Sequence, residues 1–313
     1  MEPSASINDI DKKSVDDYLM AAQKSGRLPD MGAATLPELL EKLRLSEAGK
    51  IKRGAIVLFG KDPGRFYPNI LVKIGRFGTS DDDLKFQETA EGNLIHLLQE
   101  VPELLNRKFF TKAVSFEGLL RVEKGEYPVA ALREMLLNAL VHRDYMGSAV
   151  QIRMYDNRFS SWNEGLLPQG LSLESLKRQH PSRPRNPLIA DVCFKGGYID
   201  AWGRGTLKII NSCREAGLPE PEIIEQDGGI LVTLFKDRYI EAGLRKMGLN
   251  ERQLKAVKYV TENGKITNKQ YQEILGVARI TATRDLQSLV KKGVSRYSES
   301  KGAGSYYELG IAP

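Results

Sequence analysis

Three polar side chains recur at four-residue intervals in the apolar segment "REMLLNALVHRDY": Glu134, Asn138 and His142. In an α-helix, residues four apart are displaced by only about 40° around the axis, so the three form one narrow stripe. Their neighbours are nearly all apolar, and a helix that is apolar on almost every side is normally buried. Burying an acid or an amide without partners costs roughly 2–7 kcal/mol per group. The stripe therefore meets polar groups of the protein itself or faces a ligand pocket.

The residue types in and after this stripe suit a phosphate ligand. Asn138 offers a side-chain oxygen, the kind of ligand that Mg²⁺ prefers. Glu134 can accept a proton from a water molecule that attacks a terminal phosphate, which makes it the candidate catalytic residue. Gly203 and Gly205 let the backbone approach an anion at the start of an expected helix at 206–216, where free N–H groups favour negative charge.

Each of these signals also has a simpler interpretation. Arg183, Arg185 and Arg204 can contact phosphate oxygens, but solvated loop charges are the simpler interpretation of the first two. A glycine-containing turn into a helix is common by itself. The stripe can satisfy buried backbone groups, and "HRDY" can be a polar helix end whose His142 interacts with the helix dipole.

Composition narrows the class of protein. The chain has 313 residues, 41% of them hydrophobic, which is enough for two or three domains with substantial cores. No apolar run reaches the roughly 18 residues of a membrane span, and the N-terminus lacks a signal-peptide core. We therefore expect a cytoplasmic protein without a membrane partner. Two cysteines and three scattered histidines predict neither a zinc site nor a disulfide framework.

Positive charge is concentrated at the C-terminal end. Residues 248–313 contain 11 Lys and Arg against 6 Asp and Glu, a net charge of +5, whereas the whole chain carries +6. The remaining 247 residues are therefore nearly neutral. This asymmetry predicts a polyanionic partner for the C-terminal part alone.

The apolar pattern predicts an α+β fold with a mixed sheet. We divide the chain into an N-terminal helical segment (1–50) with Thr35 as a helix cap, a central domain (51–247) and a C-terminal domain (248–313). Helices are expected at the quoted segment, on both sides of the break "GGYIDAWGRG", and at "NLIHLLQEVPELLNRKFF", interrupted at Pro102. Strands are expected at "RGAIVLFG", "NILVKIGRF", "AVQIRMYDNRFSSW" and "GILVTLF".

The C-terminal domain has the pattern of a winged helix-turn-helix. A helix at 251–262 precedes a second helix between Thr267 and Gly276 and a third at 281–292, and two strands then flank the tip "KGAG". In such a module the start of the last helix enters the major groove of DNA. The residues expected to contact duplex DNA are Arg279, Thr281, Thr283, Arg284, Gln287 and, at the wing tip, Lys301. A protein–protein contact is the alternative use of this module.

Several segments together resemble one family of bacterial transcriptional regulators: "AIVLFGKDPGRFYPN", "REMLLNALVHRDY", "WNEGLLPQGLSLESL", "RNPLIA" and "WGRGTLKII". Its members carry a domain similar to the C-terminal part of the RecG ATP-dependent DNA helicase. That domain is a distant relative of the gyrase, MutL and histidine-kinase ATPases, which share the Bergerat ATP-binding fold. The resemblance covers about 35–237 and implies a mixed sheet with helices on one face. It also implies ATP and Mg²⁺ as cofactors, with Asn138 on the metal.

The resemblance implies a set of nucleotide-binding residues: Asn138, His142, Asn163, Gly165, Arg183, Arg185, Gly203, Gly205 and Thr206. One departure concerns the adenine-contacting loop, usually D-x-G-x-G, because Asn163 replaces the Asp and Leu166 stands near the second glycine. The lid segment at 171–187 is basic rather than glycine-rich. Family members often begin with a Schlafen/AlbA-type domain, which this sequence lacks, so we expect a truncated or naturally short member.

Three classes of function fit these observations. The first is a DNA-binding transcriptional regulator, a homodimer on two half-sites, whose Bergerat-like domain senses a nucleotide effector or dimerises. The second is an ATP-hydrolysing enzyme with Glu134 as general base, and the third is a nucleotide-free scaffold. Helicase activity is not expected, because the sequence contains no G-x-x-x-x-G-K-[ST] phosphate loop.

Overall fold

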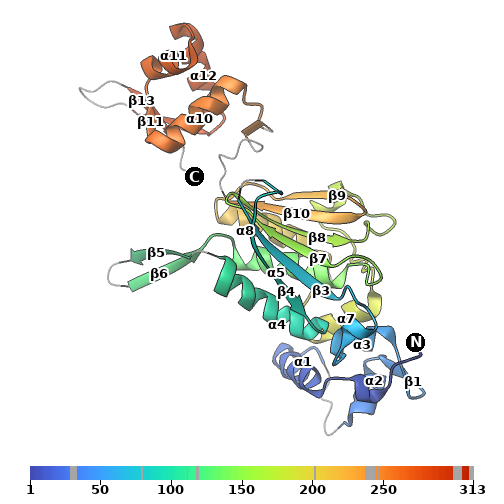
Figure 1. Cartoon of the computed structure of the whole chain (residues 1–313). Coiled ribbons are helices and arrows are strands. Elements are labelled where there is room, and N and C mark those ends of the chain that lie inside the picture. Colours follow the sequence, from blue (N-terminus) through green and yellow to red (C-terminus); the bar gives the residue numbers. More distant parts are fainter. Residues whose placement is uncertain are drawn as a thin grey trace. The chain divides into compact units, whose positions relative to one another are not determined.

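The chain forms two compact units in the computed structural model (Figure 1). The first comprises Met1–Ala216 and Glu220–Lys236, and the second comprises Gly217–Pro219 and Asp237–Pro313. The two N-terminal helices belong to the first unit. The structure describes residues 1–28, 34–78, 80–110, 112–117, 120–200, 202–236, 244–245, 247–298 and 305–309, with only the backbone described at 112–117, 120–124 and 262.

Within the described residues, the first unit is built on a six-stranded sheet with the order β4-β3-β7-β8-β10-β9. Neighbouring strands are antiparallel except β3 and β7, which are parallel, so the expected mixed sheet is confirmed. The strands are β3 (Leu71–Phe77), β4 (Leu84–Glu91), β7 (Val150–Met154), β8 (Arg158–Glu164), β9 (Glu222–Gln226) and β10 (Gly229–Phe235).

Helices pack on the apolar face of this sheet (Figure 1). The helix α4 (Leu94–Leu104) lies against β3 and β4, and α5 (Val129–Val141) lies against β8 and along α8 (Gly205–Glu215). The other helices and two hairpins of this unit are α1 (Lys12–Ser25), α2 (Leu36–Lys42), α3 (Arg53–Phe59), α6 (Leu173–Leu176), α7 (Pro187–Lys195), the π-helix Leu105–Phe109, β1 (Ser46–Glu47) with β2 (Lys50–Ile51), and β5 (Lys112–Glu117) with β6 (Leu120–Gly125).

Two local predictions are wrong. The segment "RGAIVLFG", expected as a strand, is the helix α3, in which Ala55 to Phe59 are all buried. A run that is buried on every side has no apolar period that separates a helix from a strand. Pro102 does not interrupt α4, which continues through it to Leu104 and then into a π-helical turn.

The second unit contains α10 (Glu251–Asn263), α11 (Asn268–Leu275) and α12 (Arg279–Lys291). Its described strands pair in the order β11 (Lys265–Ile266), β13 (Tyr306–Leu309) and β12 (Ser295–Ser298). The predicted caps of α11 are confirmed, because the Thr267 hydroxyl accepts from the Gln270 N–H and Gly276 ends the helix at a φ of +62°. Lys301 lies outside the described residues.

No helix in the described part of the chain is long and apolar enough to cross a membrane.

Candidate functional site

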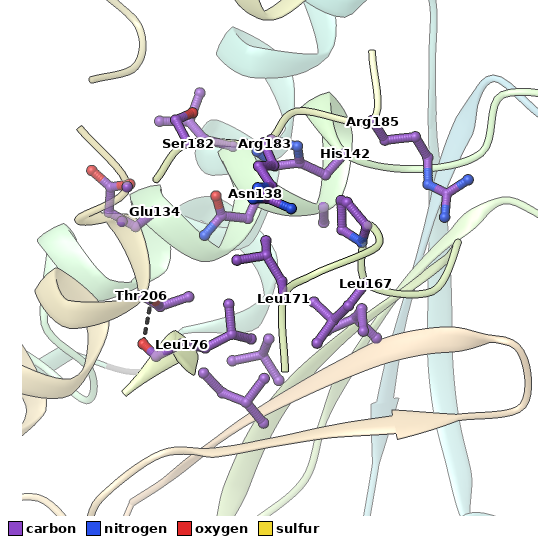
Figure 2. Close-up of a pocket in the computed structure, with 18 of the residues that line it drawn as sticks. Glu134, Asn138, His142, Leu167, Leu171, Leu176, Ser182, Arg183, Arg185 and Thr206 are labelled. Carbon is purple, nitrogen blue, oxygen red and sulfur yellow. Dashed lines mark hydrogen bonds between the residues drawn. The ribbon is translucent and has the colours of Figure 1, made fainter. Parts of the chain in front are cut away.

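The polar stripe of α5 lines a cavity of about 150 Å³ in the first unit (Figure 2). Glu134, Asn138 and His142 follow one another along this wall, and Leu167 and Leu171 lie across the cavity from them. The loop after β8 and the residues at the start of α8, Gly203 to Thr206, complete the lining. The prediction that the stripe faces a concavity is confirmed.

The sheet supplies a mixed polar and apolar floor. Ser161 and Asn163 lie two apart on β8 and therefore face the same side, paired with Val232 and Ile230 of β10. Ser161 is only 3% exposed, and its hydroxyl has no hydrogen-bond partner in the described part of the chain. An unsatisfied buried polar group costs about 1–3 kcal/mol, so this hydroxyl is poised for a ligand or a water molecule. Ser161 was not singled out from the sequence, although its alternation with Asn163 along the expected strand could have identified it.

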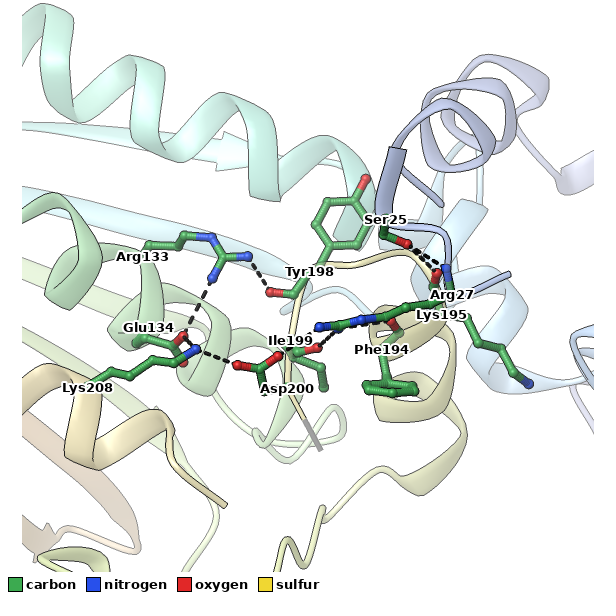
Figure 3. A network of polar contacts seen from close by, with 10 residues as sticks. All are labelled: Ser25, Arg27, Arg133, Glu134, Phe194, Lys195, Tyr198, Ile199, Asp200 and Lys208. Atoms are coloured by element: carbon green, nitrogen blue, oxygen red, sulfur yellow. Dashed lines mark hydrogen bonds and ion pairs between the residues drawn. The ribbon is translucent and has the colours of Figure 1, made fainter. Parts of the chain in front are cut away.

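Glu134 is held by cations of the protein itself (Figure 3). It is 6% exposed, and its Oε1 lies 3.2 Å from the Lys208 ammonium and 3.5 Å from the Arg133 guanidinium. Lys208 also bonds Asp200 at 2.6 Å, and this hydrogen bond, followed by one from Arg27, holds the pKa of Asp200 below its ordinary value. The sequence predicted Glu134 here but not Lys208 or Asp200.

Asn138 is the stripe residue that remains free for a ligand. Its half-buried amide has no hydrogen-bond partner among the described residues, and it lies beside the start of α8. A Cβ at Gly205 would come within 3.0 Å of Glu134 Oε2 and 3.5 Å of the Asn138 amide, so glycine permits this close approach. The free amide oxygen fits one direct bond to Mg²⁺, which would keep waters and ligand phosphates as its other partners.

No group of three or more His, Cys, Asp or Glu side chains that could hold a metal occurs among the described residues. A Mg²⁺ ion at Asn138 would therefore depend on oxygens of the ligand. Lys208 already occupies the Oε1 side of Glu134, so only Oε2 of this carboxylate would be open to the metal.

Two loop arginines predicted to contact phosphate bind the loop after β8. Arg183 Nη1 donates to the Gln169 carbonyl at 2.6 Å, and Arg185 Nη2 donates to the Leu166 carbonyl at 2.7 Å. Both side chains are exposed and lie at the cavity, with further N–H donors. Both arginines therefore hold the loop after β8 in place, and their remaining N–H donors can still contact a phosphate.

The expected glycine and threonine positions close the cavity. Gly203 adopts a φ of +62°, and a Cβ there would lie 1.9 Å from the His180 carbonyl oxygen. Gly165 also has a positive φ, +117°, and packs against Arg185. The Thr206 hydroxyl donates to the Leu176 carbonyl at 2.7 Å, so it fixes the lid segment and is not free for a ligand (Figure 2). Arg204 is exposed directly before α8.

His142 is neutral at pH 7, because burial, and then the charge of Arg185, lower its pKa to about 4. His142 is the C-cap residue of α5, as the polar helix end predicted, but in its neutral form it adds no positive charge to the helix dipole. The last carbonyls of α5 are satisfied in another way. The Asn186 amide donates to Val141 at 2.9 Å and to Arg143 at 2.8 Å, and the Tyr145 hydroxyl donates to Leu140 at 2.7 Å.

This shift predicts an acid-sensitive first unit. His142 is protonated near pH 6.5 in the unfolded chain but only near pH 4 in the folded chain. The free energy of unfolding that neutral His142 contributes is therefore fully present above pH 6.5 and is lost as the pH falls toward 4. Between pH 7 and pH 5 we expect the wild type to lose about 2 kcal/mol more free energy of unfolding than His142→Gln. Urea unfolding at both pH values measures this difference, and equal losses would contradict a neutral His142.

Comparison with known proteins identifies part of the first unit. Residues 147–234 match the family described as "Putative ATP-dependent DNA helicase recG C-terminal". The chain contains an ATPase-like domain. The match includes Asn163, Gly165 and the start of α8, but it begins after the α5 stripe. No curated protein matches the chain.

A solved structure has the same fold. The DIP2311 protein from Corynebacterium diphtheriae superimposes with a TM-score of 0.59 at 19% sequence identity. The match covers 99% of this chain and 64% of that chain, so this chain spans less than two thirds of its length. At this identity the likeness concerns the fold alone.

Proposed function

We propose that this protein is a DNA-binding regulator whose ATPase-like unit senses a nucleotide. The observation that carries the proposal is the unbonded Asn138 amide, which lines the cavity of an ATPase-like domain close to the start of α8. A ligand with a flat ring and a phosphate chain matches this combination of apolar floor, orphaned hydroxyl and free amide.

The cavity is large enough for only one part of such a ligand. A cavity of about 150 Å³ holds one small ring system. The base would therefore occupy the floor near Ser161 and Asn163, and the phosphates would lie at the rim. There the N–H groups at the start of α8 and the exposed Arg204 favour negative charge. Mg²⁺ would join Asn138 to the phosphates.

The ion pair of Glu134 with Lys208 favours sensing over turnover. A general base needs an oxygen free to take a proton from water. Here Oε1 is bonded to Lys208 and Arg133, and these two cations stabilise the negative charge that proton transfer would remove, so we propose that occupancy of the site, rather than hydrolysis, carries the signal. An ATP-hydrolysing enzyme is the second outcome of the test that follows.

Asn138→Ala is expected to weaken Mg²⁺-dependent binding of a fluorescent ATP analogue roughly tenfold, about 1.4 kcal/mol. The cause is the loss of the one direct protein ligand to the metal. Asn69→Ala, which removes an exposed amide outside the cavity, is the matched control. Glu134→Gln should leave binding within a few-fold and phosphate release unchanged near background.

Other results would lead elsewhere. Phosphate release by the wild type that Glu134→Gln removes would establish the enzyme. If the wild type binds no nucleotide with or without Mg²⁺, the nucleotide-free scaffold is the function that remains.

The arrangement of the second unit supports the DNA-binding half of the proposal. Two helices, α11 and α12, are joined by a short turn after Gly276 and lie with a three-stranded sheet, as in a winged helix-turn-helix. Arg279, Arg284 and Gln287 are exposed on α12, and neither arginine has an ion pair among the described residues. The acid of α12, Asp285, is buried away from this surface.

Two side chains at the start of α12 change the expected contact set. The Thr283 hydroxyl accepts from the Asn268 amide and donates to the Arg279 carbonyl, both at 2.9 Å, so it joins α11 to α12 rather than pointing outward. Ile280 is 83% exposed, and an apolar side chain on a helix in the major groove can contact the methyl group of thymine. A homodimer with two such helices would read two half-sites.

Arg284→Ala should weaken binding to duplex DNA and reduce the slope of log affinity against log salt by about 0.9, because one phosphate contact is lost. Lys258→Ala, an exposed cation on α10, is the control and should leave the slope unchanged. Fluorescence anisotropy from low to high salt measures both slopes. Removal of residues 237–313 should abolish binding, and a truncated chain that still binds DNA would contradict the assignment.

A further inference from the structure

The end of α1 packs against the connection between α7 and α8. The Tyr18 hydroxyl donates to the Val192 carbonyl at 3.2 Å, and the Ser25 hydroxyl lies 3.3 Å from the Lys195 carbonyl. A Cβ at Gly197, which has a φ of +77°, would lie 2.5 Å from Ser25 Cβ. This contact holds the segment that leads to Ile199 and Asp200, two residues of the cavity wall.

Arg27, directly after α1, binds this segment most extensively (Figure 3). Its Nη1 donates to the Ile199 carbonyl at 2.7 Å, its Nη2 bonds Asp200 at 2.9 Å, and its guanidinium lies 4.7 Å from the centre of the Phe194 ring. From α5, Arg133 donates to the preceding carbonyl, that of Tyr198, at 2.5 Å. Two helices distant in sequence therefore hold successive carbonyls of the cavity wall.

The ion pairs continue from Arg27 into the cavity. Asp200 bonds Lys208 at 2.6 Å, and Lys208 bonds the buried Glu134 at 3.2 Å. Arg27 neutralises part of the negative charge of Asp200. Lys208 can therefore bond both Asp200 and Glu134. Without Arg27, Asp200 would draw Lys208 more strongly and leave Glu134 less well neutralised, and a poorly paired buried charge is unfavourable.

We propose that Arg27 is a positioning residue of the ligand site, although it does not line the cavity. It acts through Asp200 and Lys208 on Glu134, and through the Ile199 carbonyl on the backbone of the wall. This proposal rests on the nucleotide binding proposed above. Because coupling free energies are reciprocal, the nucleotide also stabilises the docked end of α1.

Two measurements test this coupling. Arg27→Ala should weaken binding of the fluorescent ATP analogue about tenfold, whereas Arg65→Ala, which removes an ion pair with Asp9 outside the cavity, should not. Arg27→Lys keeps the charge but not the planar fork, so it should fall between the two. In the wild type, ATP should slow amide hydrogen exchange in α1 several-fold and leave α2 unchanged.

The outcomes are distinguishable. A purely structural Arg27 would lower the thermal midpoint of the variant, with unchanged affinity and no effect of ATP on exchange in α1; that result overturns the proposal. If the wild type binds no nucleotide, both the proposed function and this coupling are contradicted. The exchange measurement uses the unaltered chain, so a poorly folded variant does not decide the result.

Discussion

Gly203→Ala is expected to lower the free energy of unfolding of the first unit by about 3 kcal/mol and to abolish nucleotide binding. A non-glycine residue in the left-handed region costs roughly 1–2 kcal/mol, and Gly203 has a φ of +62°. The new Cβ would also lie 1.9 Å from the His180 carbonyl oxygen, a backbone atom that no rotamer change can move. Such overpacking typically costs a further 1–3 kcal/mol. Since both residues line the cavity, its wall must shift.

Gly228→Ala separates strain from close approach. Gly228, in the turn between β9 and β10, has a φ of +75° with nothing within 4 Å of the added Cβ. It should lose roughly 1–2 kcal/mol and keep its nucleotide affinity. Urea unfolding and titration with the fluorescent ATP analogue compare the two variants. Equal losses of stability, or intact binding by Gly203→Ala, would show that the wall does not depend on this contact.

The parts of the fold that the sequence predicted are those with a strong local signal. The hairpin β7–β8 alternates around Asp156-Asn157, and Thr267 and Gly276 delimit α11 by their capping chemistry. β4 lies at the sheet edge and is mostly exposed on both faces, so its sequence has no apolar alternation and it was missed. The edge strand β9 was missed as well.

In the candidate site, too, the sequence predicted the residues with a local signal and missed their partners from distant segments. The spacing of Glu134, Asn138 and His142 predicted the cavity wall, because all three belong to one helix. The partners of that wall come from far along the chain: Lys208 is 74 residues from Glu134, and Asp200 is 173 residues from Arg27. Nor does a sequence indicate that Arg183 and Arg185 bind backbone carbonyls, since every residue type offers the same acceptor.

Asp285→Ala is expected to lower the free energy of unfolding of the second unit by about 1–3 kcal/mol, because it leaves the hydroxyl of the buried Tyr271 without its acceptor. Asp285 is 4% exposed, and its Oδ2 accepts from Arg252 Nε at 2.9 Å and from the Tyr271 hydroxyl at 3.0 Å. It therefore joins α12 to α10 and α11 at one atom. Small domains are stable by only about 0.05–0.15 kcal/mol per residue, so this loss is a large fraction of the stability of the unit.

Asp285→Asn and Glu273→Ala are the matched variants. The amide oxygen of Asn can still accept from Tyr271 but carries no charge, so its loss should be intermediate. Glu273 belongs to an exposed pair with Lys269 at 3.8 Å, and its removal should change stability by less than about 1 kcal/mol. Thermal melting followed by circular dichroism ranks the three. Because Asp285 is buried and offers nothing to DNA, Asp285→Ala should lose DNA binding only through unfolding. Loss of DNA binding by a variant whose second unit melts like the wild type would contradict this expectation.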